Sequence, residues 1–175
     1  MQYLYGYDLS FGPLYLVASD AGLTQAIFPW ASASFPITGL SVATQYLELP
    51  PGMLWVETEL LRRAAAELEE YFAGTRKTFD LPLDPIGTAF QKKVWQALLA
   101  IPYGETRSYQ DVAEQVGKPR AYRAVGGANR NNPLPVFIPC HRVLGKDGAL
   151  TGYGGPSPAG LAFKKKLLEL EKSHR

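Results

Sequence analysis

Three short apolar runs open the chain and predict strands. They span Tyr3–Tyr7, Leu14–Ala18 and Leu23–Phe28. Gly12-Pro13 and Asp20-Ala21-Gly22 separate them, and short apolar runs divided by turn residues are typical of an antiparallel meander. Residues 30–57 carry three prolines and little hydrophobic pattern. We therefore expect a loop-rich segment after the meander.

A single amphipathic helix follows. It begins at Thr58 and ends before Gly74, and its apolar positions recur at helical spacing: Leu61, Ala64, Ala65, Leu68 and Phe72. Residues 75–87 are punctuated by proline and acidic residues, as expected of a connector. The sequence therefore predicts two domains, residues 1–85 and residues 86–175.

The second half is predicted to hold four helices around one short strand. Two residue pairs are spaced as capping boxes that open helices: Thr88 with Gln91, and Ser108 with Asp111. The second of these helices ends at Gly117 and another begins near Pro119, which is a helix-turn-helix pattern. The apolar run Val136–Ile138 predicts the buried strand. The last helix is expected to begin around Ser157-Pro158.

The second helix of this pair, expected within residues 120–132, has two distinct sides. Its small apolar side is formed by Ala121, Ala124, Val125 and Ala128. On another side Arg123 and Arg130 flank Gly126 and Gly127. Glycine inside a helix costs about 1 kcal/mol relative to alanine, so either a partner's backbone approaches this side or another helix packs tightly against it. A helix-turn-helix pattern is typical of DNA-binding proteins. Glycine has no side chain that could hydrogen-bond to a base edge, so these glycines favour contact through the DNA backbone and the minor groove.

Composition places the chain among globular proteins, with 175 residues of which 46% are hydrophobic and 19% charged. Residues 1–85 carry 4 Lys/Arg and 10 Asp/Glu, a net charge of −6, whereas residues 86–175 carry 14 and 6, a net charge of +8. A basic half favours a polyanionic partner. An unevenly charged surface without such a partner is the alternative.

Several classes of protein and site are excluded by what the sequence lacks. It has no run of 18 apolar residues and no secretory signal, so we expect a cytoplasmic protein without a membrane partner. One cysteine excludes an internal disulfide and a zinc site built from several cysteines, and two histidines make a histidine-built metal site improbable. The glycine-rich stretch after the cysteine matches no nucleotide-binding spacing, so no nucleotide cofactor is expected.

The one cysteine, Cys140, stands beside His141 in the segment NNPLPVFIPCHRV. Prolines on both sides of the apolar run restrict the backbone and hold these residues at the end of a rigid element. His141 can act as a base and Arg142 favours a thiolate, which indicates a nucleophile. The alternative is an inert buried thiol. Glu171 can orient the imidazole if it lies on the buried side of the last helix, but not if it is exposed near the C-terminus.

These motifs together resemble the O6-alkylguanine-DNA alkyltransferases. The resemblance runs from about Phe90 to Glu171 and is carried by IPCHRV at Ile138–Val143, RAVGGANRNNP at Arg123–Pro133 and YGETRSYQDVA at Tyr103–Ala113. It implies a mixed α/β (α+β) fold. An N-terminal ribonuclease-H-like domain would precede a C-terminal winged-helix-like (helix-turn-helix) domain that carries the active-site cysteine.

The resemblance implies DNA repair by direct reversal of damage. Cys140 would take the alkyl group from O6-alkylguanine, and from O4-alkylthymine, in double-stranded DNA after base flipping. The transfer would be irreversible, without a cofactor, and each monomeric molecule would act once. His141, acting through a water and oriented by Glu171, would generate the thiolate. Asn132 would brace the recognition helix against the active-site strand, and Tyr109 would help to rotate the nucleotide out.

Further residues are assigned by the same resemblance. Arg123 would fill the gap left by the extruded base, and the DNA contacts would be completed by Tyr109, Gly126, Arg130 and Ala121. The substrate pocket would be lined by Tyr153, Gly154, Val143 and Pro135. The chain departs from many members in an apparent insertion at Pro156–Ala159 and in Gly154, where some members carry serine. Both departures concern the loop expected to close over the alkyl group.

Three other functions fit parts of the sequence. A binding-only alkyltransferase-like protein would recognise alkylated DNA without transfer, but such proteins lack the acceptor cysteine. A cysteine hydrolase could use Cys140, His141 and Glu171, although no segment indicates an oxyanion hole. A transcriptional regulator is disfavoured by the glycines on the reading face of the second helix.

Overall fold

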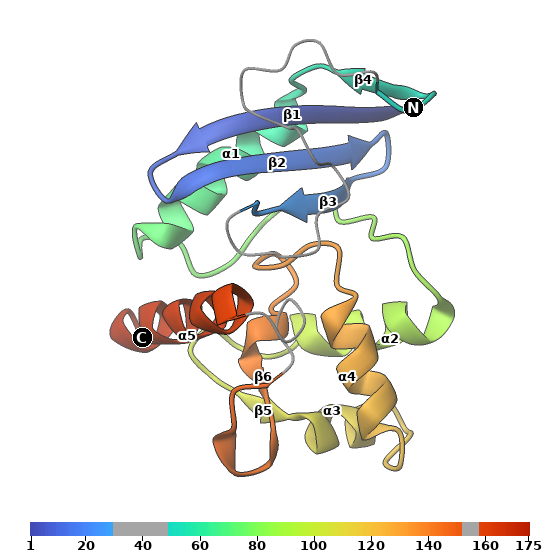
Figure 1. The fold of residues 1–175 in the computed structure, drawn as a ribbon, viewed down its shortest axis with the longest axis vertical. Helices are drawn as coiled ribbons and strands as arrows, with labels where there is room; N and C mark the ends of the chain where they lie inside the picture. The colour runs from blue at the N-terminus through green and yellow to red at the C-terminus, as the bar shows by residue number, and fades with distance from the viewer. Residues whose placement is uncertain (30–48, 152–157) are drawn as a thin grey trace.

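A computed structural model describes residues 1–29, 49–151 and 158–175 of the chain. Figure 1 shows a twisted sheet with helix α1 behind it in the upper part, and the remaining helices gathered below. The fold is a mixed α/β fold, as the sequence predicts. None of the helices in the described part of the chain is long and apolar enough to cross a membrane.

The three predicted N-terminal strands are confirmed, and a fourth joins them. The strands are β1 (Gln2–Leu9), β2 (Gly12–Ser19), β3 (Leu23–Ile27) and β4 (Met53–Trp55). They form one sheet in the order β3-β2-β1-β4, in which only β4 runs parallel to its neighbour β1. The expectation of a loop-rich segment over residues 30–57 missed β4. A three-residue strand is too short to show an alternating pattern.

Helix α1 (Glu59–Phe72) covers one face of the sheet and begins as predicted at the N-cap Thr58. Alternate residues of β2 point to this face, where Leu14, Leu16 and Ala18 join the core. That core continues without a break into the second half of the chain and includes Phe163 and Leu167. The two halves therefore share one hydrophobic core.

Within residues 86–151 and 158–175 the second half contains four α-helices, as predicted. They are α2 (Ala89–Leu99), α3 (Tyr109–Gln115), α4 (Tyr122–Arg130) and α5 (Pro158–Ser173). Both capping boxes form, with Thr88 and Gln91 opening α2 and with Ser108 and Asp111 opening α3. The prediction of a single short strand was wrong. Two short parallel strands are present instead, β5 (Arg107–Ser108) and β6 (Val143–Leu144).

Helices α3 and α4 form the predicted helix-turn-helix, with two corrections. The second helix begins at Tyr122 rather than near Pro119, because residues 118–121 form a turn closed by a hydrogen bond from Ala121 N to Lys118 O. Ala124 was expected on the packed side but is exposed. Asn129 is buried in the packed face together with Val125 and Ala128.

The predicted strand Val136–Ile138 is not a strand. The segment makes a tight turn in which Ile138 N donates to Leu134 O at 2.8 Å and Val136 has a φ of 75°. Its residues are buried as expected, because the turn packs into the core rather than into a sheet. An apolar run shows burial but not backbone conformation, which explains the error.

The loop before this turn is attached to the sheet. Ala26 N on the edge strand β3 donates to Pro133 O at 2.9 Å. Farther along the same strand, Leu23 N donates to Pro82 O at 2.8 Å and Leu23 O accepts from Asp84 N at 2.7 Å. The edge of β3 is thus covered by the connector on one side and by the loop that leads to Cys140 on the other.

Candidate active site and DNA-facing groove

Cys140 lies in a short 3-10 helix, η1 (Cys140–Arg142), at the end of the tight turn. Asn132 fixes the turn: its Nδ2 donates to Ile138 O at 2.8 Å and its Oδ1 accepts from Leu134 N at 3.0 Å. Asn129 Nδ2 donates to Cys140 O at 3.3 Å, which ties η1 to helix α4. The cysteine is 4% exposed and forms no disulfide.

His141 and Glu171 form a buried pair. Nε2 of His141 lies 2.6 Å from Oε1 of Glu171, and both side chains are almost fully buried. Because a carboxylate faces Nε2, the proton of the neutral imidazole sits on Nε2 and Nδ1 is left as an acceptor. Nδ1 is buried and has no hydrogen-bond partner among the described residues. Burial lowers the pKa of His141, against the opposing effect of Glu171.

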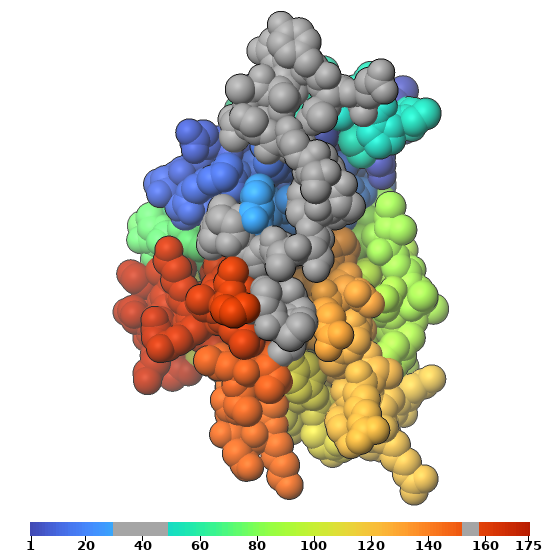
Figure 2. Space-filling model, viewed as in Figure 1, coloured from blue at the N-terminus to red at the C-terminus, as the bar shows by residue number. Residues whose placement is uncertain are grey.

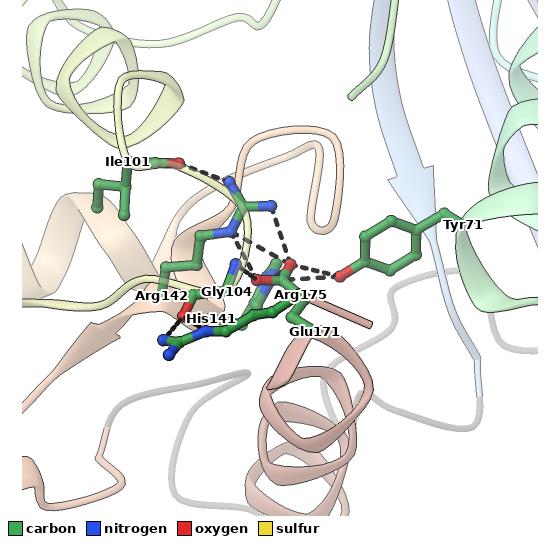
Figure 3. A network of polar contacts seen from close by, with 7 residues as sticks. All are labelled: Tyr71, Ile101, Gly104, His141, Arg142, Glu171 and Arg175. Atoms are coloured by element: carbon green, nitrogen blue, oxygen red, sulfur yellow. Dashed lines mark hydrogen bonds and ion pairs between the residues drawn. The ribbon is translucent and has the colours of Figure 1, made fainter. Parts of the chain in front are cut away.

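Four groups donate hydrogen bonds to the carboxylate of Glu171 (Figure 3). Besides His141, they are the Tyr71 hydroxyl at 2.6 Å, Gly104 N at 2.9 Å and the guanidinium of Arg142 at 2.9 Å. Burial by itself would raise the pKa of Glu171, but the hydrogen bonds from His141 and Arg142 outweigh it and hold that pKa well below its usual value. Glu171 is therefore a fully ionised buried anion.

The guanidinium of Arg142 donates to Glu171 and, through Nη1, to Ile101 O at 2.6 Å. It thereby joins η1 to α5 and to the end of α2. The predicted effect of Arg142 on the thiolate stays a prediction. Gly104 also belongs to this network, because its N donates to Glu171 and its O accepts from Nε of Arg175 at 2.9 Å. A side chain would be strained here, since φ is 76° and a Cβ would lie 2.9 Å from the side chain of Arg175.

Lys164 is a fully buried cation on the other side of the cysteine. Its Nζ donates to Val143 O at 2.5 Å and to Thr151 O at 2.8 Å, and it lies 5.9 Å from the ring centre of Tyr109. Burial lowers the pKa of Lys164 to about 8, although the nearby Cys140 raises it. A positive charge in this position stabilises a thiolate.

A groove of about 470 Å³ runs along the exposed side of α4. It is lined by Tyr109, Tyr122, Arg123, Gly126, Gly127, Arg130 and Thr151. Figure 2 shows α4 and the segment after β6 projecting at the bottom of the view, with α3 set back between them. Tyr109 is half-buried at the inner wall and donates to Thr151 O at 2.9 Å.

The two helical glycines face open space rather than another helix. A Cβ on Gly126 would meet the ring of Tyr109 at 4.0 Å, an ordinary contact, and a Cβ on Gly127 would meet no described atom within 4 Å. Tight helix packing therefore does not explain these glycines within residues 1–29, 49–151 and 158–175. The other explanation that the sequence suggested, close approach of a partner's backbone, remains.

The structure brings most of the predicted site residues together in two places. Cys140, His141 and Glu171 lie in the buried centre, where Asn132 holds the turn and Val143 is fully buried. Arg123 and Arg130 are exposed along the groove, with Gly126 and Tyr109 between them.

The other predicted residues lie at the margins of these two places. Ala121 is the half-buried N-cap of α4. Pro135 is half-buried and faces Ile138 across the turn through an isolated bridge. Tyr153 and Gly154 lie outside the described residues, as do the first two residues of the Pro156–Ala159 insertion.

Three buried polar residues of the site were missed by sequence reasoning: Tyr71, Asn129 and Lys164. Tyr71 continues the stripe of α1 three residues after Leu68, so its burial was readable, but its partner Glu171 is 100 residues away. Lys164 stands beside two exposed lysines on α5, and nothing in a run of three lysines indicates which one is buried.

No metal centre is indicated in the part of the chain that the structure describes. It contains no group of three or more His, Cys, Asp and Glu side chains placed to hold a metal ion.

Sequence models of one family match both halves of the chain. Residues 3–85 match the ribonuclease-like domain of 6-O-methylguanine DNA methyltransferase, and residues 89–173 match its DNA-binding domain. The methylated-DNA–protein-cysteine methyltransferase of Methanosarcina barkeri is 46% identical over 164 residues, which cover 93% of this chain and 92% of the relative. The constitutive enzyme of Bacillus subtilis is 60% identical over 116 residues, 66% of this chain and 68% of the relative.

Solved structures give the same family. The O6-methylguanine methyltransferase of Mycobacterium tuberculosis has a TM-score of 0.77 at 41% identity, covering 100% of this chain and 95% of that one. The M. tuberculosis protein OGT in complex with DNA has a TM-score of 0.76 at 42% identity, covering 98% and 94%.

Proposed function

The chain belongs to the 6-O-methylguanine DNA methyltransferase family, and on that premise we propose that it repairs DNA by transferring an alkyl group from O6-alkylguanine to its own Cys140. The observation that carries the proposal is the contact between Glu171 and Nε2 of His141, which leaves Nδ1 as a buried proton acceptor in the residue next to the only cysteine. A thiol next to such a general base is activated as a nucleophile.

The transfer is a single displacement. The thiol proton of Cys140 passes through a water to Nδ1 of His141, and the imidazolium is stabilised by the carboxylate of Glu171. The thiolate forms a bond to the alkyl carbon as the bond from that carbon to O6 breaks. The electron pair leaves with guanine, which takes up a proton. The product is a thioether, and no described group near Cys140 could regenerate the thiol, so each molecule would react once.

DNA binding is proposed for the groove along α4. The exposed guanidiniums of Arg123 and Arg130 neutralise phosphates or fill space left in the duplex. The glycine face of the helix lets the DNA backbone approach from the minor groove. Tyr109 stands between the groove and the cysteine, where it helps to rotate the damaged nucleotide inward. Burial raises the pKa of Tyr109, so its hydroxyl stays protonated.

The remaining assignments rest on the family resemblance. We propose that residues 1–85 and 86–175 are the two domains and that Ala121 completes the DNA contacts. Val143 and Pro135, with Tyr153 and Gly154, would form the alkyl pocket. Double-stranded DNA is the proposed partner, with O4-alkylthymine as a second lesion. The thiol of Cys140 must stay reduced to react, which favours a cytoplasmic location.

Intact mass spectrometry tests the proposal. The protein is incubated with a short duplex that contains one O6-methylguanine, and with the same duplex containing guanine as a control. A single added methyl group, absent in Cys140→Ser, is the expected result. Binding of the methylated duplex without transfer would instead identify a binding-only protein, and repeated release of product without a mass change would contradict a single-use acceptor.

A further inference from the structure

The hydroxyl of Tyr71 reaches the carboxylate of the site from the other half of the chain. Tyr71 lies near the C-terminal end of α1, is fully buried, and donates to Oε1 of Glu171 at 2.6 Å. The same hydroxyl lies 3.4 Å from Nε2 of His141. Figure 3 shows its ring entering the network from the side opposite Arg142.

We propose that Tyr71 is a positioning residue for the transfer reaction, because its hydroxyl sets how strongly Glu171 holds the proton on His141. This inference rests on the proposed function. It means that the N-terminal half, which carries neither the cysteine nor the DNA-facing helix, completes the site.

The physical argument concerns the charge on Oε1 of Glu171. Tyr71 and His141 both lie 2.6 Å from this oxygen, and each donor takes up part of its negative charge. Without the Tyr71 hydroxyl, more charge would face His141 and the imidazolium would be more stable. The reactive form of the coupled pair is a Cys140 thiolate beside a His141 imidazolium. One further proton leaves a thiol beside the imidazolium, and this protonation of the pair would then occur at a higher pH.

The contribution of the Tyr71 hydroxyl can be tested separately from the packing of the Tyr71 ring. The ring of Tyr71 packs against three aromatic rings, with centres 5.5 Å from Phe72, 5.5 Å from Phe79 and 6.0 Å from Tyr103. Tyr71→Phe keeps these contacts and removes only the donor. Burial, followed by the charge of Glu171, raises the pKa of Tyr71, so the hydroxyl remains a donor throughout the working range of pH.

In the part of the chain that the structure describes, groups on five segments face the Cys140–His141 pair and its carboxylate. They are Glu171 and Lys164 from α5, Arg142 from η1, Tyr71 from α1, Tyr109 from α3 and Tyr103 from the loop before β5. Among them Tyr103 offers a matched control. Its hydroxyl is buried close to the network but has no hydrogen-bond partner among the described residues.

The experiment compares pH profiles for the native protein, Tyr71→Phe and Tyr103→Phe. The rate of Cys140 alkylation by iodoacetamide is measured by intact mass, which is specific because the chain has one cysteine. Methyl transfer from the O6-methylguanine duplex is measured over the same range. In a fourth protein, 3-fluorotyrosine, a stronger donor, is incorporated at position 71.

The expected result is a graded shift of the acidic limb of both profiles. Tyr71→Phe moves the limb to higher pH by about 0.5–1 unit, less than the full effect of one hydrogen bond to a charged group, because the hydroxyl acts on His141 through Glu171. Fluorotyrosine moves it to lower pH, and Tyr103→Phe leaves it in place. The fluorotyrosine protein keeps the test decisive even if Tyr71→Phe does not fold.

Two failures are distinguishable. If the native protein transfers no methyl group, the proposed function is overturned, whereas the iodoacetamide profiles still report on Tyr71. If transfer occurs but the limb stays fixed across the Tyr71 series, or if every rate falls equally at all pH values, the hydroxyl serves packing alone and this inference is wrong.

Discussion

The side chain of Asn132 donates to Ile138 O at 2.8 Å, and this bond holds the turn that precedes Cys140. Asn132→Ala removes it together with the bond from Leu134 N. We expect the free energy of unfolding to fall by about 1–3 kcal/mol and methyl transfer to slow, because Cys140 follows the released turn directly. Urea unfolding and single-turnover transfer measure the two effects. Asn131→Ala, one residue earlier and exposed, should change neither.

Glu171→Gln should impair both stability and reactivity. The substitution leaves the guanidinium of Arg142 buried without its anion, which typically costs about 3–5 kcal/mol. Loss of the carboxylate also destabilises the imidazolium of His141, so we expect iodoacetamide to react with Cys140 about tenfold more slowly or worse at neutral pH. Glu169→Gln, an exposed substitution on the same helix, is the control. Equal reactivity of the two variants would remove Glu171 from the mechanism.

Gly127→Ala should make the protein more stable but a poorer DNA binder. The added methyl group meets no described atom within 4 Å, and alanine favours a helix interior by about 1 kcal/mol. The same methyl group stands where the DNA backbone is proposed to approach. Thermal unfolding and fluorescence anisotropy with a duplex measure these opposite effects. Unchanged affinity would show that DNA does not closely approach Gly127.

A matched control for this prediction lies in the turn before α4. Gly117 has a φ of +76° and its Cβ position is open, so Gly117→Ala introduces backbone strain rather than a new contact. It should lower the thermal midpoint and leave DNA affinity almost unchanged.

Alkylation should destabilise the protein. The sulfur of Cys140 is in a side chain that is 4% exposed, and an extra methyl group in a closely packed site typically costs about 1–3 kcal/mol. Thermal unfolding before and after reaction with methylated DNA should therefore show a lower midpoint for the reacted protein. Cys140→Ser, incubated in the same way, should show no change.

Acid should destabilise the fold in two stages. Burial places the folded-state pKa of His141 below its ordinary 6.5, and hydrogen bonds from His141 and Arg142, opposed by burial, place that of Glu171 below its ordinary 4.5. In both cases the unfolded chain binds more protons, so stability is lost as the pH falls below about 6.5 and again below about 4.5. Thermal midpoints between pH 8 and about pH 3 test both stages. His141→Gln should flatten the first stage, and an equally steep curve in that variant would contradict the assignment.

Local signals in the sequence were sufficient for most elements. The capping boxes at Thr88 and Ser108 define helix starts through contacts within four residues, and both form as predicted. The stripe of α1 predicted its length and its packed face. Cys140 beside His141, directly after an apolar run flanked by prolines, was enough to indicate a nucleophile.

What the sequence did not show depends on distant contacts. The apolar run Val136–Ile138 suits a strand or a buried turn equally well, and only the clamp from Asn132 selects the turn. Whether Glu171 was buried or exposed could not be decided from its helix alone. It is buried because Tyr71, Arg142 and Gly104, from three other segments, supply donors to its carboxylate.

The hydrogen bond from Ala26 N to Pro133 O ties the loop that leads to Cys140 to the edge strand β3. Uncovered edge strands invite pairing with other chains and aggregation, and this loop shields one end of β3 while residues 82–84 shield the other. A fragment that stops at residue 85 would leave β3 half bare and should form insoluble assemblies. The loop that leads to Cys140 thus also covers a sheet edge that could otherwise pair with another chain.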